Sequence, residues 1–282
     1  MTRLSDTFAR LKRDGRTGLI GYVTTGFPDV ETTLAVVPAI VEAGCDIIEL
    51  GVPFSDPLAD GATIQRANQA ALERGVTLET CLQVAETLRK RLPLVPILLM
   101  GYYNPVLAFG VDRFALRAAK AGVDGVIVPD LPPEEAGPLA EALRGPGMAV
   151  VFMLAPTSTD RRMDEVAGMS SGFVYCVSLT GVTGARSELS ADLPGFLARV
   201  RRHTSLPLAV GFGISTAEHV RTVGEHADAV VVGSALVATI EKGGKAGAVE
   251  GARKFVAELS KGTGRTLTLH PLPRTGEGRN MT

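Results

Sequence analysis

Eight short apolar segments, separated by stretches with helical spacing, constrain the fold of this chain more than any other feature. The segments are rich in β-branched residues and lie at 19–24, 46–50, 96–101, 125–128, 149–153, 173–177, 208–211 and 229–232. Most are continuous rather than alternating, which is typical of strands that are buried on both faces. We therefore predict eight parallel strands, since strands that are joined through helices run parallel.

The intervening stretches have the spacing of amphipathic helices and lie at 30–44, 77–91, 111–122, 133–143, 158–168, 190–203 and 215–224. They open on capping residues or Pro and close on Gly or basic residues. Eight such repeats predict an α/β fold, a single (β/α)8 TIM barrel, with an open doubly wound sheet as the alternative. The first strand is followed by Thr24-Thr25-Gly26-Phe27-Pro28 and not by a GxGxxG loop, which disfavours a dinucleotide-binding sheet.

Both ends of the chain lie outside the repeats. A helix predicted at 3–14 precedes the first strand, where we expect it to close the barrel floor. A short helix is predicted at 234–241 and a last one at 245–261. Residues 262–282 are rich in Gly, Pro, Thr and Arg, and we predict a disordered tail. The expected organisation is one barrel domain, 1–261, followed by the tail, 262–282.

Composition excludes several classes of function. The net charge of −1 gives no electrostatic basis for binding nucleic acid or an anionic membrane. No apolar run is long enough for a transmembrane helix, and the N-terminus lacks the apolar core of a secretory signal. Cys45, Cys81 and Cys176 are odd in number and far apart, which favours buried thiols in a reducing cytoplasm over a disulfide framework.

Two carboxylates stand where a barrel carries its chemistry, at and beyond the C-terminal end of the second strand. Glu49 lies within an apolar strand and shares a face with Ile47 by strand alternation. If that face points inward, burial raises the pKa of Glu49 and suits it to give and take a proton near neutrality. Asp60 follows in the next loop and suits paired acid–base work, with an exposed turn residue as the alternative interpretation.

Three Gly-rich loops follow the last three strands, at 178–186, 211–215 and 233–236. Backbone N–H groups in such loops, together with a helix N-terminus at Ser234, predict a phosphate site of the kind that barrels build near strands 7 and 8. Side chains at other strand ends are large and apolar enough to hold a flat ring, although Ile127 also fits an ordinary core position. These candidate pocket walls are Tyr22, Met100, Tyr102, Ile127, Tyr175 and Phe212.

The sequence lacks the residues that several kinds of catalysis require. The four histidines stand away from the strand ends, and no cluster has metal-ligand spacing. No GxSxG elbow or Walker loop occurs. No Lys lies on a predicted strand, so Schiff-base cleavage of a carbon–carbon bond lacks its amine. Such cleavage would have to proceed by acid–base chemistry alone.

Residues 49–61 resemble the hallmark segment of tryptophan synthase alpha chains, as do 129–132, 178–184, 211–215 and 233–235. The resemblance runs from about Arg3 to Lys261, and its first segment is highly specific. It implies a lyase that cleaves indole-3-glycerol phosphate to indole and glyceraldehyde 3-phosphate in tryptophan biosynthesis. Glu49 then matches the catalytic acid/base, and Asp60 matches the carboxylate that stabilises positive charge on the indole ring.

The resemblance also implies further site residues and a partner. Tyr175 matches a tyrosine beside the active site, and Thr183 a threonine that contacts Asp60 when the site closes. The phosphate would rest on Gly184, Gly213, Gly233 and Ser234. The family works as an αββα heterotetramer, with pyridoxal phosphate in the beta chain and no cofactor in this chain. Residues 53–60 and 103–109 match the segments that face beta.

Three other interpretations stay open on the sequence. A stand-alone lyase would release free indole without a beta chain. A non-catalytic regulatory subunit would be expected to lack one of the carboxylates, yet Glu49 and Asp60 are both present. A sugar-phosphate isomerase on the same scaffold would need carboxylates at the ends of strands 1 and 5, where Thr24 and Leu154-Ala155 stand.

Overall fold

The strands form one parallel sheet that closes on itself. The computed structural model describes residues 2–177, 192–211 and 213–264. The strands are β1 (Gly18–Thr24), β2 (Ile47–Gly51), β3 (Ile97–Met100), β4 (Gly125–Ile127), β5 (Ala149–Val151), β6 (Met153–Leu154), β7 (Val174–Val177), β8 (Leu208–Gly211) and β9 (Ala229–Val232). Their order is β5-β4-β3-β2-β1-β9-β8-β7-β6, and the pairs are parallel.

The predicted fifth strand is divided in two, and this division is where the barrel closes. β5 pairs with β4, whereas β6 pairs with β7. Phe152 lies between them, and its carbonyl accepts from the backbone N–H of Tyr175 at 3.0 Å. The two edges of the sheet therefore meet in a single segment of chain. This closure confirms the predicted barrel and excludes the open doubly wound sheet.

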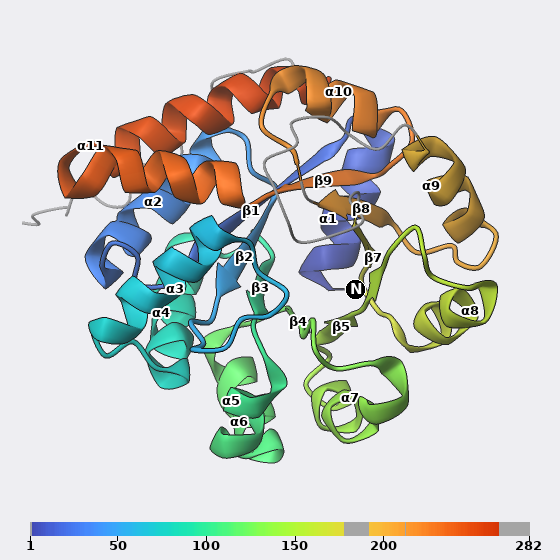
Figure 1. The fold of residues 1–282 in the computed structure, drawn as a ribbon, viewed down its shortest axis with the longest axis horizontal. Helices are drawn as coiled ribbons and strands as arrows, with labels where there is room; N and C mark the ends of the chain where they lie inside the picture. Colours follow the sequence, from blue (N-terminus) through green and yellow to red (C-terminus); the bar gives the residue numbers. More distant parts are fainter. Residues whose placement is uncertain (1, 178–191, 212, 265–282) are drawn as a thin grey trace, which may run out of the picture.

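Helices surround the strands as an outer ring (Figure 1). They are α2 (Val30–Ala43), α4 (Leu78–Arg91), α6 (Val111–Ala121), α7 (Gly137–Arg144), α8 (Asp160–Met169), α9 (Leu193–Arg201), α10 (Ala217–Gly224) and α11 (Ser234–Ser260). The helix expected at 133–143 is a 3-10 turn, η1 (Pro133–Glu135), followed by α7. Pro138 explains the interruption, because it lacks a backbone N–H and its ring clashes with the carbonyl four residues before it. The two helices expected after β9 form α11, whose backbone is non-helical at Gly244.

Two helices were not predicted, α3 (Ala62–Glu73) and α5 (Tyr103–Phe109). α3 follows β2 after the loop 52–61, and α5 begins shortly after β3, so both lie beyond the C-terminal ends of strands. Neither has a capping side chain: α3 begins after Gly61, and α5 begins after Tyr102. The usual start signal of a helix is therefore missing from the sequence at both places.

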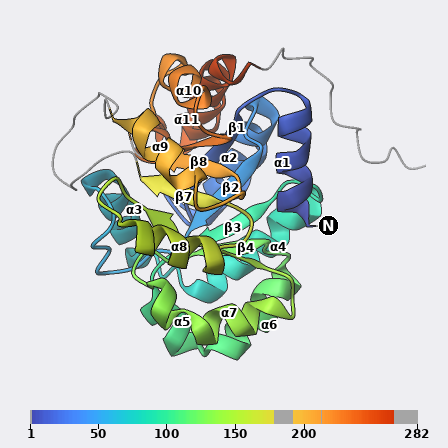
Figure 2. The same cartoon turned by 90° about the vertical axis from the view of Figure 1, so that its right-hand side faces the viewer.

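The N-terminal helix α1 (Arg3–Arg13) closes the floor of the barrel, as expected. Its residues Leu4, Phe8 and Leu11 belong to the same buried cluster as the inward side chains of the strands. The rings of Phe8 and Phe173 lie 5.8 Å apart, within the range of favourable aromatic pairs. In the view turned by 90°, α1 lies at one end of the molecule and α3 towards the other (Figure 2).

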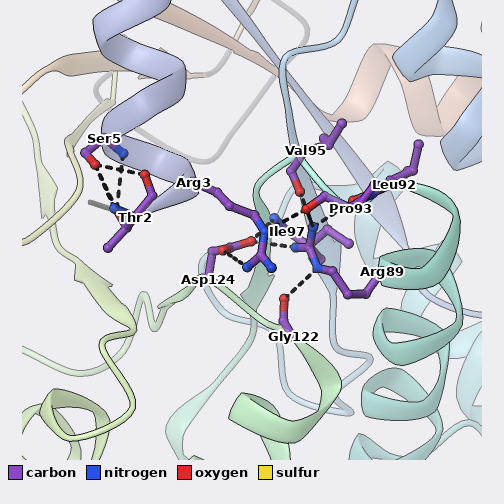
Figure 3. A network of polar contacts seen from close by, with 10 residues as sticks. All are labelled: Thr2, Arg3, Ser5, Arg89, Leu92, Pro93, Val95, Ile97, Gly122 and Asp124. Atoms are coloured by element: carbon purple, nitrogen blue, oxygen red, sulfur yellow. Dashed lines mark hydrogen bonds and ion pairs between the residues drawn. The ribbon is translucent and has the colours of Figure 1, made fainter. Parts of the chain in front are cut away.

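A repeated carboxylate contact ties the strands together at the floor. An aspartate directly precedes each of β2, β4 and β9. Asp46 accepts the backbone N–H of Leu19 on β1, Asp124 accepts that of Ile97 on β3, and Asp228 accepts that of Leu208 on β8. Asp124 also accepts from Arg89 at 2.6 Å and from Arg3 at 2.9 Å (Figure 3). Asp46 and Asp124 are buried, and both are paired with arginines and hydrogen-bonded, as buried charges must be.

Strand alternation divides the side chains into an inner and an outer core. Ile47 lies in the inner cluster, whereas Ile48 and Leu50 pack in the larger cluster beneath the outer helices. Glu49 shares a face with Ile47, as the alternation predicts, and this face points inward.

The packed part of the chain extends slightly beyond the predicted boundary at 261. Residues Lys261–Thr263 form a 3-10 turn, η2, in which Gly262 and Thr263 are buried. The carbonyl of Thr263 accepts from the N–H of Thr17 at 3.2 Å, which anchors the turn beside β1. The rest of the predicted tail, 265–282, lies outside the described residues. Within the described part, no helix is long and apolar enough to cross a membrane.

Candidate active site

A pocket with a cavity volume of about 270 Å³ opens at the C-terminal ends of the strands. This volume is close to the lower end of the range for small-molecule sites, about 300 Å³. Its lining residues are Tyr22, Glu49, Asp60, Gly61, Ile64, Met100, Tyr175, Gly213, Ile214, Ser215, Val231, Gly233, Ser234 and Ala235. The two predicted carboxylates therefore share one pocket with two of the predicted Gly-rich loops.

Glu49 lies on β2 opposite Tyr22 on β1, with which it is in register. Its side chain is fully buried, and neither carboxylate oxygen has a hydrogen-bond partner within the described part of the chain. Burial raises the pKa of Glu49 to about 8, because the charged form loses its solvation. At neutral pH, Glu49 is thus mainly a carboxylic acid with a proton to donate, and its pKa is close enough to neutrality for it to recover one.

Asp60 is also buried, but unlike Glu49 it has partners. Its Oδ2 accepts from Nδ2 of Asn68 at 3.3 Å, and the hydroxyl of Tyr102 also hydrogen-bonds the carboxylate. Burial raises the pKa of Asp60 to about 6, against the opposing effect of the two hydrogen bonds. Asp60 is therefore mainly ionised at neutral pH while Glu49 is mainly protonated. Two carboxyl groups held in opposite states assign the roles of acid and anion within one site.

Two tyrosines lie over glycines of neighbouring strands. A Cβ at Gly51 would lie 2.1 Å from the hydroxyl oxygen of Tyr22, and a Cβ at Gly211 would lie 2.1 Å from that of Tyr175. Glycine at these two strand ends therefore leaves the space that each ring occupies. Burial raises the pKa of both tyrosines, so their hydroxyls remain protonated.

The opposite wall of the pocket is backbone. Gly233, Ser234 and Ala235 form the start of α11, where no side chain caps the helix. The first N–H groups of a helix lack partners within it and carry partial positive charge, so this end suits an anion. Gly213, which has φ of 80°, contributes from the loop after β8. Such a wall can hold a phosphate group.

The other predicted site residues lie in several places. Met100 lines the pocket. Tyr102 lies beside it, with its ring stacked on Phe54 at 5.1 Å and its hydroxyl accepting the N–H of Ala59 at 2.9 Å. Ile127 does not line the pocket: it is fully buried in the inner core, the alternative that the sequence left open. Thr183, Gly184 and Phe212 lie outside the described residues.

Two lining residues lie outside the segments that the sequence singled out. Ile64 belongs to α3, which the sequence did not reveal, and Val231 lies near the C-terminal end of a predicted strand. Ile214, Ser215 and Ala235 lie within the predicted Gly-rich loops, and Gly61 ends the segment 49–61. No group of three or more His, Cys, Asp or Glu side chains in the described ranges is arranged to hold a metal ion.

The fold and pocket define a (β/α)8 barrel that presents two buried carboxyl groups and, in the same site, a backbone wall at an uncapped helix start. Residues 8–265 match the family model of the tryptophan synthase alpha chain. The chain is 55% identical to the tryptophan synthase alpha chain of Roseiflexus castenholzii over 92% of its own length and 99% of that protein. It belongs to the tryptophan synthase alpha chain family, and it is accordingly a lyase of tryptophan biosynthesis.

Solved structures agree with this assignment. A structure of Mycobacterium tuberculosis tryptophan synthase superposes with a TM-score of 0.85 at 40% identity, covering 93% of this chain and 98% of that one. The tryptophan synthase alpha chain of Legionella pneumophila gives a TM-score of 0.86 at 34% identity, covering 93% and 97%. The match extends over the whole barrel, so the fold and the family are shared along nearly all of the chain.

Proposed function

We propose that this chain cleaves indole-3-glycerol phosphate to indole and glyceraldehyde 3-phosphate, with Glu49 as the acid/base and Asp60 as the stabilising anion. The observation that carries the proposal is the complete burial of Glu49, without a partner among the described residues, in the pocket that also holds Asp60. A buried acid with a pKa of about 8 is suited to both halves of a proton relay.

The reaction begins with protonation of the ring. Glu49 donates its proton to C3 of the indole, and positive charge develops on the ring nitrogen. Glu49, now a carboxylate, takes the proton of the hydroxyl on the glycerol carbon bonded to C3. The bond between that carbon and C3 breaks, and its electron pair returns to the ring. The carbon becomes the aldehyde of glyceraldehyde 3-phosphate, and indole leaves as a neutral molecule.

Asp60 supplies the opposite charge. An ionised carboxylate beside the ring N–H stabilises the cation that protonation at C3 creates, and a pKa of about 6 keeps Asp60 ionised at neutral pH. We assign Tyr22, Met100, Tyr102 and Tyr175 to the walls around the ring. Thr183 and Phe212 stay predictions of the same kind, and Ile127 supports the site from the core.

The phosphate is assigned to the backbone wall of Gly213, Gly233 and Ser234, with Gly184 as a further predicted contributor. The support for this assignment is the uncapped start of α11, whose N–H groups and partial charge favour an anion. The phosphate would anchor one end of the substrate, so that C3 of the ring stays within reach of Glu49.

We also propose that the chain works in the cytoplasm as part of an αββα heterotetramer, whose beta chain carries pyridoxal phosphate while this chain needs no cofactor. The family supports a partner, since the M. tuberculosis structures are of tryptophan synthase. Two exposed leucines support its location: Leu58 is 87% exposed within 53–60, and Leu107 is 51% exposed on α5. Both lie in the segments that resemble the family's beta-facing surface.

The test is indole release from indole-3-glycerol phosphate by the chain alone and with a tryptophan synthase beta chain. We expect slow release alone and a large increase on mixing. An unchanged rate on mixing would support the stand-alone lyase instead, and binding of the substrate without cleavage under either condition would support the regulatory subunit.

A further inference from the structure

Asp60 is held by two side chains of the helix α3, Gln65 and Asn68. Nε2 of Gln65 donates to the backbone carbonyl of Asp60 at 2.9 Å, and Nδ2 of Asn68 donates to the carboxylate at 3.3 Å. Gln65 therefore holds the loop, whereas Asn68 acts on the charged group. Asn68 is 2% exposed and does not line the pocket, so it reaches the reaction only through Asp60.

The other polar atom of the Asn68 amide gives a second, independent observation. Its Oδ1 is buried and has no hydrogen-bond partner within the part of the chain that the structure describes. A buried carbonyl oxygen without a partner is unfavourable for folding. An apolar side chain of the same shape would avoid this penalty, since the neighbouring buried residues of α3 are Ala67 and Ala71. Stability therefore does not explain an asparagine here.

We propose that Asn68 is a positioning residue, which holds the carboxylate of Asp60 in place and in its ionised form for the cation on the substrate ring. The inference rests on the proposed role of Asp60. Asn68 donates one N–H to the carboxylate and contacts no substrate. Asn68 therefore contributes to the reaction through the dipole of its side-chain N–H, which points at the carboxylate of Asp60 and stabilises its negative charge.

The groups around Asp60 show why the N–H that Asn68 donates matters for the ionised form of the carboxylate. Among the described residues, the titratable side chains that interact with Asp60 are Tyr22 on β1, Tyr102 after β3 and Tyr175 on β7, and Glu49 on β2 lines the same pocket. None of these groups is a cation. Asn68 and Tyr102 donate the side-chain hydrogen bonds that favour the ionised form of Asp60, against burial, which favours the neutral form.

The first test measures Asp60 directly. Protein labelled with ¹³C at the carboxyl carbon of aspartate is titrated by NMR in the wild-type chain and in Asn68→Leu, with Asp60→Asn to assign the signal. Leu has the shape of Asn without its donor. We expect the pKa of Asp60 to rise by about one unit. The matched control is Gln69→Leu at the exposed neighbouring position, which should leave the titration unchanged.

The second test separates positioning from folding. Below pH 6, kcat/KM for indole release by Asn68→Leu should fall about tenfold relative to wild type, and the ratio should return towards one near pH 8. Thermal unfolding at pH 5, where Asp60 is mainly protonated in both folded proteins, should show no loss of stability. An unshifted Asp60 titration in a folded variant, or a kcat/KM below pH 6 that equals the wild-type value, would overturn the proposal. If the wild-type chain releases no indole, the proposed function fails, whereas the NMR titration still decides the action of Asn68 on Asp60.

Discussion

Tyr22 and Gly51 are fitted to one another at the ends of two neighbouring strands, β1 and β2. The tyrosine hydroxyl occupies the position that a side chain on Gly51 would need, at 2.1 Å from an added Cβ. Because Tyr22 is also the register partner of Glu49, the space at Gly51 determines where the ring beside the proposed catalytic carboxyl lies.

Gly51→Ala should therefore displace Tyr22 and disturb the site more than the fold. We expect kcat/KM for indole release to fall at least tenfold, with a loss of about 1–3 kcal/mol in the free energy of unfolding, as for other overpacked positions. Steady-state kinetics and urea unfolding measure the two effects. Gly137→Ala is the control, since no atom lies within 4 Å of its added Cβ. Unchanged kinetics in Gly51→Ala would contradict this account of the pair.

The pH dependence of kcat/KM should be bell-shaped. Activity should rise as Asp60 ionises, with an apparent pKa of about 6, and fall as Glu49 loses the proton that it must donate, with an apparent pKa of about 8. In Asp60→Asn, the residual kcat/KM should no longer fall as the pH drops below 6. A profile that is flat between pH 5 and 9 would show that neither group titrates as assigned.

The burial of Glu49 should also make the free energy of unfolding depend on pH. Since the pKa of Glu49 is about 8 in the folded chain and near 4.5 when unfolded, the folded state binds more protons between these values. The free energy of unfolding should therefore fall as pH rises through this window, by several kcal/mol as an order of magnitude. Glu49→Gln should be close to wild type at pH 4.5 and more stable at pH 9, measured by urea unfolding. A variant that is less stable at pH 9 would indicate a paired structural glutamate.

Gly233→Ala should act on phosphate binding alone. The added Cβ meets no protein atom closer than 3.8 Å, so the fold accommodates it, yet it enters the pocket beside the start of α11. We expect KM for indole-3-glycerol phosphate to rise about tenfold or more, and KM for unphosphorylated indole-3-glycerol to change little. An equal rise in KM for both substrates would show that the phosphate does not bind at this wall.

The barrel could be predicted from the sequence because its strands are buried on both faces, which leaves continuous apolar runs between helical stretches. Strand alternation likewise predicted that Glu49 shares a face with Ile47, and the packing of Ile47 in the inner core shows that this face points inward. The floor was predictable too, because the apolar face of α1 carries Leu4, Phe8 and Leu11.

The contacts of Asp60 could not be predicted in the same way. They depend on α3, which starts after Gly61 without a capping side chain and buries only Ala67, Asn68 and Ala71. They also depend on the loop before α3, which returns over the end of β3 so that Tyr102 reaches Ala59 and Asp60. Such contacts depend on the path that the loop takes in space, and this path cannot be predicted from the spacing of residues along the chain.

The most direct test of the central claim is single-turnover cleavage of indole-3-glycerol phosphate by the wild-type chain and by Glu49→Gln, with enzyme in excess over substrate. Gln has the shape of Glu but does not exchange a proton with the substrate. The account predicts substrate affinity within a few-fold of wild type and indole formation slower by about 10²–10⁴-fold, the contribution of a positioned acid or base. Indole formation by Glu49→Gln within tenfold of the wild-type rate would contradict it.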